Sequence, residues 1–180
     1  MDEVFLDKDY YLSIGRLTDQ KNFKFLIKVF SKNYHKFKNK KLVIIGEGEN
    51  YDYLKQMIIK YKMTNNIYLI GFKKNVYKYI KNCLALISVA DYEDPGFTLI
   101  EAAYLRKKII TSLVRNGPIE MKKNDEMCYF FEPNNEVDFV NKILDSEKDE
   151  NPKIRLIKAQ KFSKKFTIFS HYKSFEKLLS

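Results

Sequence analysis

The segment Tyr10-Tyr-Leu-Ser-Ile-Gly-Arg-Leu-Thr-Asp-Gln-Lys21 begins with residues typical of a buried strand, which ends at a glycine and a polar loop. A helix is predicted after it, with its apolar side chains on one face: Phe23, Leu26, Ile27, Phe30, Tyr34 and Phe37. Lysines follow one another on the opposite face: Lys24, Lys28, Lys32 and Lys36. A second apolar run, Leu42 to Ile45, ends at another glycine. This order of strand, helix and strand predicts two parallel strands joined by a right-handed crossover.

The same alternation continues along the chain. Six strands are predicted: Tyr10–Ile14, Leu42–Ile45, Ile67–Ile70, Leu84–Val89, Ile109–Ser112 and Met127–Phe131. Further helices are predicted over 51–62, 76–83, 98–106, 136–146 and 152–164, with a last one ending near residue 179. The strands are nearly continuous apolar runs, as in parallel sheets that are covered on both faces. We therefore predict an α/β fold with an open parallel sheet of about six strands and helices on both faces.

The composition of the chain indicates the kind of partner and excludes several classes of protein. The chain of 180 residues has 33 Lys and Arg against 23 Asp and Glu, a net charge of +10 that favours an anionic partner. No apolar run approaches the roughly 18 residues of a membrane span, and the first residues do not resemble a signal peptide. Two cysteines and two histidines, all far apart, suit neither a disulfide framework nor a metal site. These features predict a cytoplasmic protein.

All six glycines are predicted at one edge of the sheet. Gly15, Gly46 and Gly71 each end a strand, and the others lie in the loops that follow strands: Gly48, Gly96 and Gly117. The carboxyl edge of an open α/β sheet is where ligands bind, because glycine lets backbone approach them and helix N-termini offer free amides to anions. The glycines therefore favour a phosphate-bearing ligand, although each glycine alone could simply end a strand.

Two common nucleotide motifs are absent. Gly46-Glu-Gly48 lacks the third glycine of the dinucleotide fingerprint, and no Gly-x4-Gly-Lys-Ser/Thr sequence occurs. The loop after the first strand instead carries Arg16 and Lys21, five residues apart. Arginine offers phosphate a planar fork and lysine a mobile charge, so the pair suits a diphosphate leaving group, unless both are simply solvated.

The strongest segment is Asp91-Tyr-Glu-Asp-Pro-Gly-Phe-Thr-Leu-Ile-Glu101, an acidic cluster in a basic chain. If a helix begins near Phe97 or Thr98, its free amides can bind an anion, and Glu101, one turn later, can accept from hydroxyl groups. The alternative is that Glu93 or Asp94 only caps the helix.

In order along the chain, these segments resemble the C-terminal, donor-nucleotide-binding domain of retaining GT-B glycosyltransferases of glycosyltransferase family 4 (group 1). The resemblance rests on Gly-Arg-Leu-x3-Lys, Leu42 to Gly48, Ile67 to Phe72 and Glu93-x7-Glu-Ala-Ala, and extends from about Tyr11 to Leu144. It implies a Rossmann-like domain that forms one half of a GT-B enzyme, with the active site in the cleft between the halves. Residues 1–165 would form this domain, and residues 166–180 a helix that packs back on it or toward the missing N-terminal domain.

The resemblance also implies the site residues. Arg16 and Lys21 would hold the donor diphosphate, Glu93 the donor-sugar hydroxyls and Glu101 the ribose, with Arg16, Lys21 and Glu93 as catalytic residues. The loop at Gly71, Phe72 and Lys73 would lie against the nucleobase, and the backbone at Phe97 and Thr98 would hold phosphate oxygens. The further donor-binding positions are Gly15, Gly96 and Leu99. No metal is implied, so Asp91-Tyr-Glu93 is interpreted as a chance likeness to a metal motif. Asn22 stands where the family often has glycine.

The function implied is transfer of a sugar, with retention of configuration, from a nucleotide sugar to a glycan or lipid-linked acceptor in polysaccharide or lipopolysaccharide synthesis. A UDP-sugar is favoured, GDP- and ADP-sugars stay open, and no prosthetic group is expected. The chain alone is expected to be an inactive fragment. The lysine stripe could attach the enzyme to the inner face of an anionic membrane, or simply be solvated. Two alternatives are a basic nucleic-acid-binding module and a non-enzymatic flavodoxin-like domain.

Overall fold

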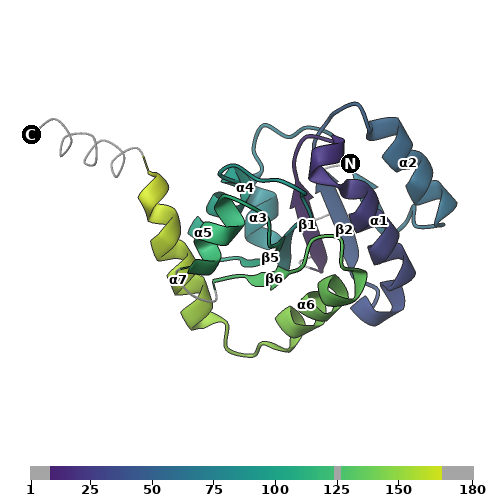
Figure 1. The fold of residues 1–180 in the computed structure, drawn as a ribbon. Helices are drawn as coiled ribbons and strands as arrows, with labels where there is room; N and C mark the ends of the chain where they lie inside the picture. Colours follow the sequence, from purple (N-terminus) through teal and green to yellow (C-terminus); the bar gives the residue numbers. More distant parts are fainter. Residues whose placement is uncertain (1–8, 124–126, 168–180) are drawn as a thin grey trace, which may run out of the picture.

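The computed structural model describes residues 9–123 and 127–167 and contains a six-stranded parallel sheet (Figure 1). Its strands are β1 Tyr10–Ile14, β2 Lys41–Ile45, β3 Ile67–Leu69, β4 Ala85–Ser88, β5 Lys108–Ser112 and β6 Tyr129–Phe131. The strand order is β3-β2-β1-β4-β5-β6, and every pair is parallel. All six predicted strands are confirmed, with ends that shift by one or two residues.

Helices connect the strands. They are α1 Phe23–Lys32, α2 Tyr51–Lys60, α3 Tyr77–Asn82, α4 Phe97–Tyr104, α5 Gly117–Lys123, α6 Glu136–Lys148 and α7 Lys153–Ser163. Short 3-10 turns occur at η1 Asp19–Lys21, η2 Tyr34–Phe37 and η3 Lys164–Phe166. The helix expected over residues 166–180 lies outside the described residues beyond position 167.

Two helices differ from the prediction. The helix after β1 does not continue to Phe37, because Asn33 leaves the helical conformation (φ −112°, ψ 14°) and its side-chain amide donates to the carbonyl of Val29 (3.0 Å). The turn η2 follows, and it still buries Phe37. The second difference is α5, where only a loop was expected.

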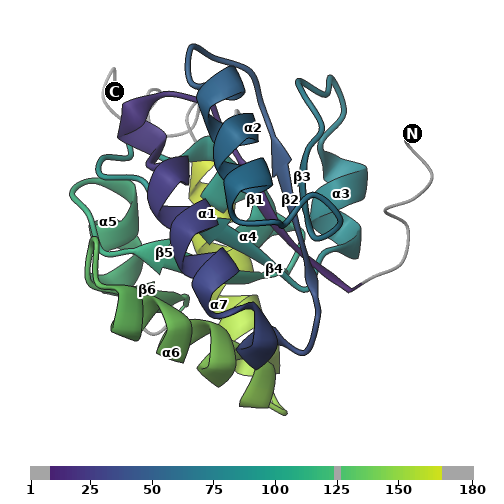
Figure 2. The ribbon, with the colours of Figure 1, turned by 90° about the vertical axis from the view of Figure 1, so that its right-hand side faces the viewer.

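Each face of the sheet has its own apolar core. Helices α1, α2 and α6 cover one face, on which alternate strand residues pack against Phe30, Leu54 and Phe139. Helices α3, α4, α5 and α7 cover the other face, with Ile80 and Leu99 in its core. Figure 2 shows the first group of helices in front of the sheet and α7 behind it. Coverage on both faces explains why the strands are apolar throughout.

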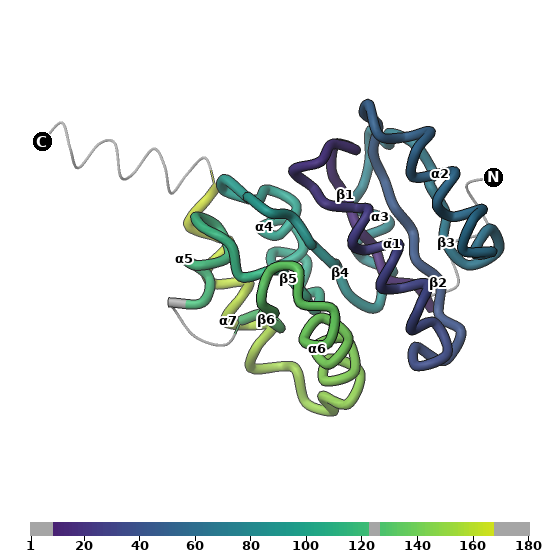
Figure 3. The backbone as a smooth tube through the Cα atoms, turned by 45° about the vertical axis from the view of Figure 1, so that its right-hand side comes forward, coloured from purple at the N-terminus to yellow at the C-terminus, as the bar shows by residue number. Residues whose placement is uncertain are grey.

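Figure 3 shows the sheet from β3 at the right to β6 at the left. The strand order reverses direction between β1 and β4. In open α/β sheets such a reversal leaves a crevice beyond the carboxyl ends of the two strands, where ligands bind. The order 3-2-1-4-5-6 is that of Rossmann domains and differs from the 2-1-3-4-5 order of flavodoxin-like domains. The loops after β1 and β4 therefore border the expected ligand crevice.

Candidate functional site

The loops after β1, β2 and β3 are joined by backbone hydrogen bonds. Gly15 N–H donates to the carbonyl of Ile45 (3.0 Å), and Gly46 N–H donates to that of Gly71 (3.0 Å). A Cβ on Gly46 would lie 1.9 Å from the carbonyl oxygen of Gly15, and the residue has a φ of +152°. Glycine at this position is therefore required by the adjacent loop, independently of any ligand.

The loops after β1 and β4 are also tied together, across the point where the strand order reverses. Asp91 N–H donates to the carbonyl of Gln20 (3.0 Å), whose side-chain amide donates to the carbonyl of Tyr92 (3.1 Å). The side-chain amide of Asn22 donates to a carboxylate oxygen of Asp91 (3.0 Å). These contacts fix the two loops that carry the expected phosphate-binding and sugar-binding residues.

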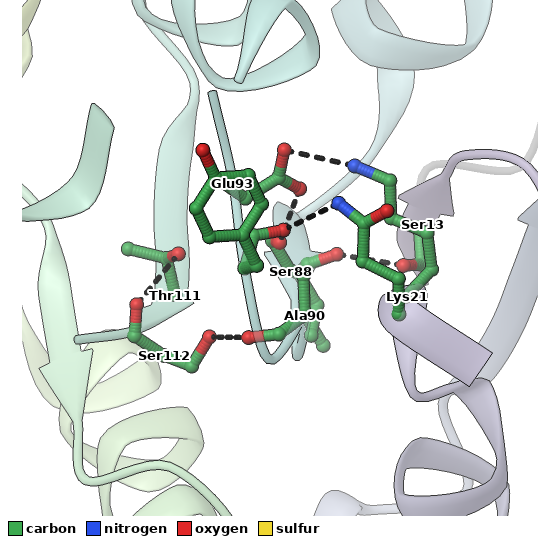
Figure 4. A network of polar contacts seen from close by, with 10 residues as sticks. Ser13, Lys21, Ser88, Ala90, Glu93, Thr111 and Ser112 are labelled. Atoms are coloured by element: carbon green, nitrogen blue, oxygen red, sulfur yellow. Dashed lines mark hydrogen bonds and ion pairs between the residues drawn. The ribbon is translucent and has the colours of Figure 1, made fainter. Parts of the chain in front are cut away.

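Lys21 and Glu93 meet at the centre of this region (Figure 4). Lys21 Nζ lies 2.8 Å from Glu93 Oε2, and Glu93 is only 4% exposed. The other carboxylate oxygen accepts a hydrogen bond from Ser88 Oγ at 3.2 Å. Two residues expected to bind different parts of a donor are thus bonded to each other.

Buried serines of the two neighbouring strands bond to the backbone that leads to Glu93. Ser13 Oγ donates to the carbonyl of Ile87 (2.7 Å), and Ser112 Oγ donates to that of Ala90 (2.6 Å). Figure 4 shows both contacts beside the Lys21–Glu93 pair. The end of β4 is thus bonded to β1, and the segment that leads from β4 to Glu93 is bonded to β5.

Helix α4 begins at Phe97, as predicted, after Gly96 in the left-handed conformation with a φ of +78°. Among the residues that the structure describes, no side chain caps it, so the alternative role for Glu93 and Asp94 as caps is not realised. Within the described part of the chain, the amides of Phe97 and Thr98 have no acceptor. An uncapped N-terminus presents partial positive charge to the space beyond the sheet edge.

Glu101, one turn into α4, lies beside Tyr77 at the start of α3. Tyr77 Oη donates to Glu101 Oε1 at 3.3 Å. Burial raises the pKa of the Glu101 carboxyl, and the hydrogen bond from Tyr77 partly opposes this shift. Both side chains border a cavity of about 380 Å³ between α3, α4 and α7. Glu101 is therefore reachable by a ligand and is already held by one neighbour.

The loop after β3 carries the residues expected at the nucleobase. Gly71 has a φ of +71°, Phe72 is 66% exposed and Lys73 is partly buried. The Phe72 N–H donates to Glu47 Oε1 (3.4 Å), so the loops after β2 and β3 also touch at this point. The exposed Phe72 ring offers a flat apolar surface.

Arg16 is exposed, and its guanidinium has no bond to any residue that the structure describes. Sequence reasoning placed it correctly in the loop but could not predict that Lys21 would be paired and Arg16 free. It also missed Gln20, Ser88 and Tyr77, whose contacts depend on strand order. Residues 9–123 and 127–167 contain no group of three or more His, Cys, Asp or Glu side chains able to hold a metal.

The lysine stripe is less free than expected. Lys24 lies 2.6 Å from a carboxylate oxygen of Asp19, while Lys28 and Lys32 both pair with Glu136 at the start of α6. The stripe thus helps to join α1 to α6. No helix within the described ranges is long and apolar enough to cross a membrane.

These features define a Rossmann-type domain of the kind found in GT-B glycosyltransferases, to which its backbone is similar. It superposes on HepE from Anabaena, in a complex with UDP and glucose, with a TM-score of 0.83 at 16% identity, covering 99% of this chain and 50% of that one. The pneumococcal O-GlcNAc transferase GtfA, in a complex with UDP and GlcNAc, gives a TM-score of 0.82 at 16% identity, covering 96% and 35%.

Residues 3–164 match the sequence model of the glycosyl transferases group 1, and the chain belongs to this family. It is 36% identical over 118 residues to an uncharacterised glycosyltransferase from Methanocaldococcus jannaschii, covering 66% of this chain and 29% of that protein. It is 29% identical over 136 residues to the Campylobacter jejuni N-acetylgalactosamine-N,N'-diacetylbacillosaminyl-diphospho-undecaprenol 4-alpha-N-acetylgalactosaminyltransferase, covering 76% and 36%. The chain thus spans about a third of these two relatives.

Proposed function

We propose that the chain is the donor-nucleotide-binding domain of a retaining GT-B glycosyltransferase of family 4, which transfers sugar from a nucleotide sugar to a glycan or lipid-linked acceptor. The observation that carries this proposal is the meeting of three features where the strand order reverses. These are the free guanidinium of Arg16, the Lys21–Glu93 pair and the uncapped N-terminus of α4.

The phosphate groups are bound from two sides. Arg16 supplies an uncompensated positive charge from the β1 loop, and Lys21 adds a second donor. The amides of Phe97 and Thr98 supply the opposite wall, because uncapped helix N-termini favour anions. A diphosphate gains negative charge as its bond to the sugar breaks, so these groups stabilise the leaving group more than the bound substrate.

Glu93 suits sugar binding better than nucleophilic attack. Its carboxylate is buried, paired with Lys21 and hydrogen-bonded by Ser88, so it is held in place and its charge is compensated. A carboxylate held in this way can accept from a sugar hydroxyl but is a weak nucleophile. This is why we favour retention through leaving-group stabilisation, with the acceptor presented by the other half of the enzyme.

The nucleoside occupies the neighbouring loops. Glu101 accepts from the ribose, and Phe72 with Gly71 and Lys73 lies against the base. UDP is the favoured nucleotide, because structures of GtfA and HepE, which share this fold, were determined with UDP. No metal or prosthetic group is part of the proposal, since cations and helix amides provide the neutralising charge.

The test is binding of UDP, GDP and ADP to the chain, measured by NMR titration. Arg16→Ala should weaken binding of the preferred diphosphate by about 10- to 100-fold, the effect of losing a charged hydrogen bond. Arg106→Ala is the matched control, because it removes the same charge just beyond the opposite end of α4. Equal affinity of the Arg16→Ala variant and the unsubstituted chain would contradict the proposal.

Membrane attachment and nucleic-acid binding are left outside the proposed function. Three lysines of the α1 stripe already pair with Asp19 or Glu136. Membership of the group 1 glycosyl transferases favours a nucleotide sugar over a nucleic acid as the anionic ligand.

A further inference from the structure

Tyr77 links the two parts of the proposed nucleoside site. It is the first residue of α3, directly after the loop that carries Phe72, and its hydroxyl reaches Glu101 on α4. The two helices pack against each other, so the contact spans neighbouring elements that are 24 positions apart in sequence. Tyr77 lies outside the sequence segments that resemble the family's motifs.

The contact holds one half of the Glu101 carboxylate. Oε1 accepts from Tyr77, whereas Oε2 has no partner among residues 9–123 and 127–167. The Glu101 charge raises the pKa of the Tyr77 hydroxyl, so the phenol stays protonated and keeps donating. One oxygen is therefore engaged by Tyr77 and the other is left to accept from a ligand.

We propose that Tyr77 is a positioning residue that orients Glu101 toward the ribose hydroxyls and so makes the site selective for ribonucleotides. The inference rests on the proposed function. A glutamate side chain free to rotate loses conformational entropy when it binds a hydroxyl, and prior fixing by Tyr77 removes much of that loss. A carboxylate fixed beside a hydroxyl also discriminates strongly against a ligand that lacks the hydroxyl, because its hydrogen bond is then lost.

A purely structural role for the Tyr77 hydroxyl predicts a different result. The residue is 52% exposed, so its ring and hydroxyl are not needed to fill the core. If the hydroxyl only stabilised the α3–α4 contact, its removal would lower the affinity for ribose and dideoxyribose ligands equally. Selective loss of ribose affinity is the signature of positioning.

The experiment compares Tyr77→Phe with the unsubstituted chain, using UDP, GDP or ADP, whichever binds most tightly, and its 2′,3′-dideoxy analogue. Tyr77→Phe should lower the affinity for the ribonucleotide about three- to tenfold, the effect of one hydrogen bond, and leave the dideoxy affinity within about twofold. In a Glu101→Gln background, Tyr77→Phe should have no further effect on the preference for the ribonucleotide over its dideoxy analogue. Tyr104→Phe is the control, because Tyr104 is also 52% exposed and its hydroxyl makes no bond in the described part of the chain.

The outcomes separate this inference from the function on which it rests. If Arg16→Ala and Glu101→Gln weaken binding but Tyr77→Phe leaves the ribose preference unchanged, the inference is overturned and the proposed function stands. Equal weakening of both ligands by Tyr77→Phe also overturns it. If the unsubstituted chain binds none of the three diphosphates, both the proposed function and the inference fail.

Discussion

At the scale of single residues, the Lys21–Glu93 pair decides how the site is charged. Lys21 is a phosphate ligand by resemblance, yet its charge is already compensated by a buried carboxylate. Arg16, by contrast, is exposed, and its guanidinium has no partner among residues 9–123 and 127–167. Affinity for a diphosphate should therefore depend more on Arg16, whereas stability should depend more on Lys21.

Replacing Lys21 by Met should destabilise the fold by about 3 kcal/mol, because the Glu93 carboxylate, 4% exposed, would lose its cation. Glu93→Gln in the same chain should restore part of this loss, since a neutral amide tolerates burial better than an unpaired charge. Urea unfolding measures both changes.

Lys24→Met provides the matched control. Lys24 also pairs with a carboxylate, that of Asp19, but their side chains are 43% and 79% exposed. Such surface pairs contribute at most about 1 kcal/mol. A loss for Lys21→Met no greater than that for Lys24→Met would show that the buried pair does not hold the two loops together.

At the scale of elements, Asp149 attaches α7 to the sheet. It accepts a hydrogen bond from Tyr129 of β6, and Arg155 Nε of α7 lies 3.6 Å from its carboxylate. Arg155 also donates to the carbonyl of Cys128 (3.2 Å) and lies over the Tyr129 ring. The hydrogen bond from Tyr129 is the main reason that the pKa of Asp149 is lowered.

This lowered pKa predicts a pH dependence of stability. A carboxyl with a lower pKa in the folded state contributes stability above its unfolded pKa, near 4, and loses it as the pH falls through the folded value. Asp149→Asn should therefore be less stable than the unsubstituted chain at pH 6, and the difference should shrink toward pH 2. Denaturant unfolding across this range gives the comparison.

Asp145→Asn is the control for Asp149→Asn. Asp145 lies on α6, is 53% exposed and pairs only loosely with Lys142 at 3.7 Å. Its substitution should leave the acid limb of the stability profile almost unchanged. Parallel profiles for Asp149→Asn and the unsubstituted chain would contradict the role given to Asp149.

Most of the strands and helices, but not all of their ends, could be predicted from the sequence alone. All six strands and the start of α4 at Phe97 follow from apolar runs and the preceding Pro-Gly turn, which are local signals. The end of α1 was missed because the apolar pattern continues through Phe37, whereas the Asn33 side chain bonds to the backbone and stops the helix. The pairing of Lys21 with Glu93, and of Tyr77 with Glu101, depends on strand order and on loop shape, which periodicity does not contain.

At the scale of the whole molecule, the net charge of +10 has a partly structural explanation. Helices α3 and α6 end at the amino edge of the sheet, where a cavity of about 530 Å³ has four lysines in its lining: Lys40, Lys81, Lys107 and Lys108. Lys108 donates to the carbonyls of Ser146 and Asp149 near the end of α6. Cations at this edge compensate the negative ends of helices, so they do not require a polyanionic ligand.

The chain as a whole should fold, bind nucleoside diphosphate weakly and transfer no sugar. Folding is expected because both faces of the sheet are covered and carry continuous apolar cores. Binding is expected because the proposed donor groups all lie in this chain, with a dissociation constant on the order of 0.1–1 mM, or about −4 to −5.5 kcal/mol.

Transfer is expected to fail because the acceptor must be oriented against the anomeric carbon, and correct positioning can contribute roughly 7–11 kcal/mol. The proposed donor site lies on an open sheet edge, and closure by a second half would be needed to exclude water. The assay incubates the chain with UDP-, GDP- and ADP-sugars and with acceptor extracts, and measures both transferred sugar and free diphosphate. Release of diphosphate without transfer would fit an open donor site, whereas efficient transfer by the chain alone would show that it already holds its acceptor and would refute the two-domain interpretation.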